Sequence, residues 1–186
     1  MLNSITAILD SGGAAAAAGA YESIATASGS GVSTITFSSI PSTYKHLQIR
    51  AMAFLPDGSN LAMRFNGDTA SNYVMHYLMG NGASASASSS GGAAAQISNV
   101  CMTNNSTSYA GVSIIDIADY SSTSKYKTTR QFTGTEDNNT QGFQSIRLGS
   151  GLWMSTSAVS SITIFNTSST SGGTGTTFAL YGIKGA

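Results

Sequence analysis

The chain has 186 residues, which is enough for one well-buried domain and too few for two ordinary ones. Eight Lys and Arg residues balance eight Asp and Glu residues, so the formal net charge is zero, and only 9% of the residues are charged. A neutral chain has no long-range field to gather phosphate backbones, so the composition argues against nucleic-acid binding. A surface rich in hydroxyl groups and poor in charge suits a protein that docks on other proteins, because few charges must be desolvated.

The sequence also argues against export and against membrane insertion. Residues 1–20 contain no basic residue and Asp10 interrupts their apolar part, so we expect no secretory signal. No stretch reaches the ~20 apolar residues of a membrane helix. We therefore expect the protein to be made and assembled in a cytoplasm. Its single cysteine, Cys101, leaves no disulfide framework, and we expect a small buried side chain there.

Residues 1–20 are predicted to form an arm before a single domain at 21–186. Four apolar residues fall at helical spacing near the start: Leu2, Ile5, Ile8 and Leu9. The tract that follows, SGGAAAAAGA, has nothing large to bury and is typical of a flexible tether. The arm either folds back on its own domain or anchors the protein on a neighbouring subunit, and we take anchoring as the working hypothesis.

From Tyr21 onward the pattern predicts short β-strands at intervals of ten to fifteen residues. Ile35 and Phe37 alternate with threonines, Leu47 and Ile49 alternate with polar residues, and Pro41 marks a corner between these two strands. Strands are expected near 21–27, 32–39, 45–54, 61–66, 73–80, 96–103, 110–118, 126–134, 142–149, 159–166 and 177–184. Residues 82–95 and 167–176 are low in complexity and are interpreted as loops, the first as a hairpin tip or flap. The chain is therefore predicted to be an all-β, jelly-roll-like antiparallel β-sandwich with an extended N-terminal arm.

No pattern in the sequence points to catalysis, so we expect no enzyme activity and no cofactor. The two histidines, His46 and His76, lie in the middle of predicted strands without metal-ligand spacing, and no Gly-x-Ser-x-Gly or phosphate-loop motif occurs. An ion site remains an alternative at two pairs of carboxylates, Asp116 with Asp119 and Glu136 with Asp137. Either pair could bind an ion such as calcium only if further oxygen ligands converge on it.

Aromatic residues near strand ends are the remaining candidates for contact with a ligand. Exposed Trp and Tyr side chains stack on sugar rings, so Trp153, Tyr109 and Tyr120 form a candidate adhesion surface. The alternative, which we favour for Trp153, is that it packs in the core or at a corner of the sandwich.

Several segments resemble a group of small β-sandwich virion proteins of tailed bacteriophages, cyanophages in particular. The segments are ITFSSIPSTYKHLQIRAMA, IIDIADYSSTSKYKTTRQFTG, VSSITIF and the ending FALYGIKGA, and the resemblance runs from about Tyr21 to the C-terminus. It implies a structural virion protein with a jelly-roll-like fold, without enzyme activity or cofactor, and it offers no motif that assigns roles to single residues.

The resemblance leaves two roles open. A short apolar arm and a compact neutral domain, with no shaft, favour a capsid decoration or cement protein that binds the major capsid protein or other virion proteins. The alternative is a tail or neck fibre, or an adhesion module whose loops bind a host glycan or protein. In either role we expect the protein to be part of the phage particle. We also expect it to form a dimer or trimer, because a chain with few charges has little to prevent its exposed sheet edges from pairing with other copies.

Overall fold

The computed structural model describes residues 19–90, 94–137 and 144–185, and these residues form β-strands and loops. The strands are β1 (Tyr21–Ser28), β2 (Thr34–Phe37), β3 (His46–Ala53), β4 (Leu61–Phe65), β5 (Tyr73–Gly80), β6 (Ala85–Ser89), β7 (Ile97–Cys101), β8 (Gly111–Ile117), β9 (Lys127–Thr135), β10 (Ser145–Trp153), β11 (Ile162–Asn166) and β12 (Thr177–Ile183). They pair antiparallel within two sheets. The prediction of an all-β antiparallel sandwich is confirmed.

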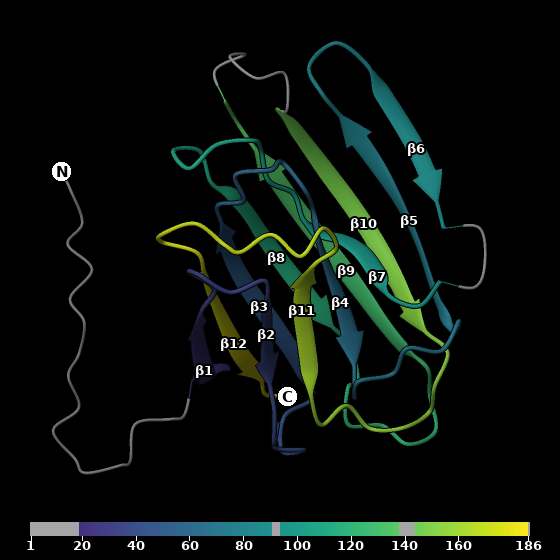
Figure 1. Ribbon diagram of the computed structural model, residues 1–186. Coiled ribbons are helices and arrows are strands. Elements are labelled where there is room, and N and C mark those ends of the chain that lie inside the picture. The colour runs from purple at the N-terminus through teal and green to yellow at the C-terminus, as the bar shows by residue number, and fades with distance from the viewer. Residues whose placement is uncertain (1–18, 91–93, 138–143, 186) are drawn as a thin grey trace, which may run out of the picture.

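The two sheets differ in size, and the smaller covers only one face of the larger. The larger sheet has eight strands in the order β1-β12-β3-β8-β9-β10-β5-β6, and the smaller has four in the order β2-β11-β4-β7. Figure 1 shows the small sheet lying in front of the large one, with the β5–β6 hairpin at the far edge. We call the side of the large sheet that faces the small sheet its inner face, and the opposite side its outer face.

The chain alternates between the sheets through most of its length. β1, β3, β8 and β12 lie together in the large sheet, whereas β2, β4, β7 and β11 make up the small one. The exceptions are β5 with β6 and β8 with β9 and β10, which follow one another within the large sheet. Strand β7 of the small sheet packs against β5, β8, β9 and β10.

The core lies between the inner face and the small sheet. Leu47 and Ile49 of β3 and Met63 and Phe65 of β4 are fully buried in it, at alternate positions of their strands. Cys101 is 1% exposed, so the expectation of a buried thiol is confirmed, and burial raises its pKa to about 12.

Strand β6 was not predicted, because residues 82–95 were interpreted as a loop or hairpin tip. Its sequence, ASASS, has no large apolar side chain and every residue in it is exposed. Pairing with β5 holds it in place, with His76 opposite Ser89 and Gly80 opposite Ala85. Backbone hydrogen bonding to a neighbour, which leaves no mark in the side-chain pattern, is what makes this segment a strand.

Candidate interaction surface

The outer face carries large apolar side chains where a water-facing sheet would carry polar ones. Seven of the ten large hydrophobic residues that are exposed in the described part of the chain lie on it, each between 40% and 62% exposed: Met52, Leu78, Val112, Ile114, Phe132, Ile146 and Leu148. A contiguous patch of this kind marks an interaction site in a folded protein.

The polarity of β9 and β10 is inverted with respect to the usual sandwich. Ile146 and Leu148 of β10 point outward, whereas Arg147 between them is 7% exposed and points inward. In β9, Phe132 is 52% exposed while its neighbour Gln131 is 2% exposed. The side that the small sheet covers is thus partly polar, and the open side is apolar. Such an inversion indicates that the outer face is covered when the protein functions.

The strand register arranges the outer face in three rows that cross the sheet from β3 to β6. The polar row contains Gln48, Asp116, Arg130, Ser150, His76 and Ser89. The middle row contains Arg50, Ile114, Phe132, Leu148, Leu78 and Ala87. The third row contains Met52, Val112, Gly134, Ile146, Gly80 and Ala85. Residues within a row are direct cross-strand neighbours, so their side chains form continuous bands.

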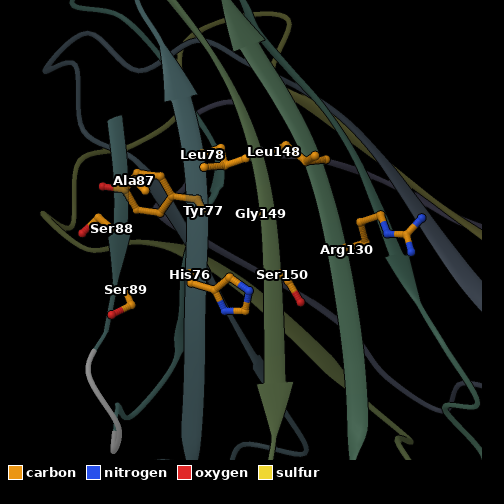
Figure 2. Close-up of a pocket in the computed structure, with 10 residues that line it drawn as sticks. All are labelled: His76, Tyr77, Leu78, Ala87, Ser88, Ser89, Arg130, Leu148, Gly149 and Ser150. Carbon is orange, nitrogen blue, oxygen red and sulfur yellow. The ribbon is translucent and has the colours of Figure 1, made fainter. Parts of the chain in front are cut away.

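Shallow hollows adjoin one another along this face. The hollow beside β5, β6 and β10 measures about 670 Å³, and Figure 2 shows His76 and Ser150 side by side in it, one row away from Leu78 and Leu148. A second hollow of about 720 Å³ lies over β8 and β9 and includes Phe132. Their openness to solvent and apolar walls suit a broad protein surface better than a small ligand.

Charge is sparse on the face, and two of its charged groups hydrogen-bond to the same neutral side chain. The Gln48 side-chain NH₂ donates to the Asp116 carboxylate at 2.8 Å, and the Arg50 Nε–H donates to the side-chain oxygen of Gln48 at 3.1 Å. The guanidinium of Arg50 also lies 5.5 Å from the centre of the Tyr181 ring. Arg130 stands in the same row, directly opposite Asp116 on β8. The middle and third rows therefore carry no charged side chain except Arg50, which stands at the β3 end of the middle row.

The candidate adhesion surface of Trp153, Tyr109 and Tyr120 is not formed. Trp153 is 2% exposed and packs on Tyr73, with ring centres 6.3 Å apart. Tyr120 is fully buried, and its hydroxyl donates to the carbonyl oxygen of Pro41. Only Tyr109 is partly accessible, at the border of the hollow over β8 and β9. Trp153 has the core role that we favoured, because its indole packs beside Phe65, with ring centres 5.4 Å apart.

The carboxylates considered for an ion site do not converge in the described residues. Asp119 instead forms ion pairs with Lys45 at 3.0 Å and Lys125 at 2.9 Å. These lysines hold the pKa of Asp119 at about 2, the Lys125 hydrogen bond contributing most. Within residues 19–90, 94–137 and 144–185 no group of three or more His, Cys, Asp or Glu side chains could hold a metal ion. The same residues contain no helix long and apolar enough to cross a membrane.

The predicted anchor residues Leu2, Ile5, Ile8 and Leu9 lie outside the described residues. What the sequence did not reveal is the apolar outer face. Its signal was present, since Ile146 and Leu148 alternate with Arg147 and Gly149, but alternation alone does not tell which side of a strand faces the core.

Comparison with known proteins adds no family. No protein-family model matches the chain, and no curated protein is similar to it in sequence. The proposal for its function therefore depends on the outer face and on the resemblance described above.

Proposed function

We propose that this protein is a non-enzymatic structural component of a bacteriophage particle, and that it serves as a decoration or cement protein on the capsid. One observation carries the structural role: seven half-exposed apolar side chains cover the open face of a sheet whose buried face is partly polar. A chain built in this way reaches its lowest free energy as part of an assembly, because each Å² of apolar surface removed from water contributes about 25 cal/mol.

The virion part of the proposal is supported by the segments that resemble small phage sandwich proteins, and by the low charge of the chain. Its partners would be the major capsid protein and further virion proteins. The N-terminal arm, with Leu2, Ile5, Ile8 and Leu9, would provide the attachment to the capsid, leaving the outer face for another contact.

The test is to locate the protein on purified particles, by electron cryomicroscopy or by immunogold labelling with an antibody against the domain. Density over the head lattice in many copies would support the decoration role. Density at the tail or neck alone, in a few copies, would replace it with the alternative of a fibre or receptor-binding adhesion module. Absence of the protein from washed particles would overturn the virion role altogether.

The role of the arm has a separate test. A variant without residues 2–18 should lose binding to capsids while keeping the circular dichroism spectrum of the sandwich. Unchanged capsid binding would show that attachment occurs through the domain instead.

A further inference from the structure

We infer that the outer face of the large sheet binds the outer face of a second copy of this chain, around a two-fold axis that runs parallel to the strands between β9 and β10. The inference goes beyond the proposed function, because it names the occupant of the face and the symmetry of the contact. It does not depend on where the protein sits in a phage particle.

The size of the apolar patch fits an interface between proteins. The seven exposed apolar side chains together offer several hundred Å² of apolar surface, which approaches the ~800 Å² that each partner buries in a standard stable interface. Two open sheet faces can pack directly, about 10 Å apart, with their strands nearly aligned. The zero net charge of the chain removes the long-range repulsion that would otherwise oppose contact between identical copies.

The order of residues along the third row is complementary to itself. A rotation about the axis between β9 and β10 places β9 of one copy over β10 of the other, β8 over β5 and β3 over β6. Positions along the strands are unchanged, so each row packs against the same row of the partner. Ile146 then lies opposite Gly134 of the partner subunit. Val112 lies opposite the partner's Gly80, and Met52 opposite the partner's Ala85. Each large side chain in this row meets a small one, as close packing requires.

The other two rows agree with the same axis. In the middle row Phe132 faces the partner's Leu148, and Ile114 faces the partner's Leu78, which keeps the apolar centre together. In the polar row the Asp116 carboxylate faces the imidazole of the partner's His76, an acceptor opposite a possible donor.

Shifting the axis by one strand destroys this match. An axis between β8 and β9 would exchange β3 with β10. It would end the alternation of large and small side chains in the third row, where Met52 would meet Ile146, and it would place the charged Arg50 against Leu148 in the middle row. An axis between β10 and β5 would place Gly134 opposite the partner's Ala85, and two such small residues would leave an unfilled space between the sheets. The register therefore selects one axis among the neighbouring ones.

The first experiment measures the mass of the purified full chain by sedimentation equilibrium over a range of concentrations. One chain has a mass of 18.9 kDa, so we expect a species of twice this mass. The double variant F132E, L148E places four carboxylates in the centre of the proposed dimer and should sediment as a monomer. Both positions are about half exposed, so the variant should keep its strand spectrum and thermal midpoint.

The matched control is V32E. Val32 is 44% exposed, precedes β2, and lies away from the outer face, so this variant should remain a dimer. A dimer that persists in F132E, L148E would overturn the proposed face.

The second experiment tests the axis with a short bis-maleimide reagent. In the double variant L78C, I114C, the thiol at position 78 of one copy faces the thiol at position 114 of the other, across the ~10 Å between packed sheets. Within one chain the two positions are three strand spacings apart, about 14 Å. We expect a covalent dimer from L78C, I114C and little from I114C alone, with Cys101 buried in both. Equal cross-linking of the two variants would overturn the axis.

Two further outcomes would overturn the inference as a whole. A full chain that stays monomeric at high concentration would show that the face has another occupant. If removal of residues 2–18 then produced a dimer, the arm of the same chain would be that occupant. Either result would leave the location of the protein on phage particles, and so the proposed function, to be decided by its own test.

Discussion

The indole nitrogen of Trp153 donates a hydrogen bond to the Asp68 carboxylate at 2.7 Å, which ties the end of β10 to the turn after β4. The same carboxylate accepts bonds from the Asn72 side chain at 2.7 Å and from the Ala70 N–H at 2.8 Å. These three donors, the one from Asn72 most strongly, hold the pKa of Asp68 below its ordinary value.

Replacing Asp68 with Asn should therefore lower the free energy of unfolding by about 1–2 kcal/mol, because the amide NH₂ would face donors in place of an acceptor. W153F keeps most of the ring and removes only the donor. A double-mutant cycle of D68N and W153F, measured by urea unfolding, should give a coupling energy of about 1 kcal/mol. Additive effects of the two substitutions would show that this bond does not stabilise the fold.

Tyr120 fixes the corner that Pro41 makes between β2 and β3. Its hydroxyl donates to the Pro41 carbonyl oxygen and accepts from the Tyr44 N–H at 3.3 Å. Y120F should cost about 1 kcal/mol of stability, since the Pro41 carbonyl oxygen loses its donor and the Tyr44 N–H loses its acceptor. The control is Y126F, at a tyrosine that is 53% exposed, which should change thermal stability little. Equal effects of the two variants would argue against a special role for the corner.

Gly111 begins β8 where the backbone of Met102 passes close by. A β-carbon at Gly111 would overlap the carbonyl oxygen of Met102, so G111A should lower stability by about 3 kcal/mol or more or prevent folding. At Gly80 the added carbon would instead lie 3.8 Å from Ile146, an ordinary contact, so we expect G80A to fold with nearly unchanged stability. Thermal unfolding of both variants, followed by circular dichroism, makes the comparison. A stable G111A would contradict the close approach of the Met102 backbone, just after β7, to the start of β8.

Acid should weaken the cluster around Asp119. Its pKa falls from 3.8 to about 2 in the folded chain, because Lys125 and Lys45 bind the charged carboxylate. The stabilisation is present above pH 3.8, where the unfolded carboxyl is also ionised, and it is lost as the pH falls from about 4 to about 2. Urea unfolding midpoints of the wild type should therefore fall more steeply over this range than those of D119N. Parallel curves would show that the ion pairs contribute nothing measurable.

Much of the fold could be read from local pattern. The alternation of Leu47 and Ile49 with polar neighbours predicted β3, and Pro41 predicted the corner before it. A buried Cys101 and a core role for Trp153 also followed from residue type. These inferences succeed because period-2 alternation, turn chemistry and side-chain size act within a few residues of the chain.

The candidate interaction surface could not be read in this way. Ile146, Leu148 and Phe132 occupy alternate positions of strands just as core residues do, and only the packing of the small sheet on the opposite side leaves them exposed. The strand β6 likewise depends on its pairing with β5, and the match between Ile146 and Gly134 depends on the register of β9 with β10. Sequence pattern thus determined which residues form strands and which residues are apolar. The tertiary structure decided which apolar face remains open, because one sheet of four strands covers only one side of a sheet of eight.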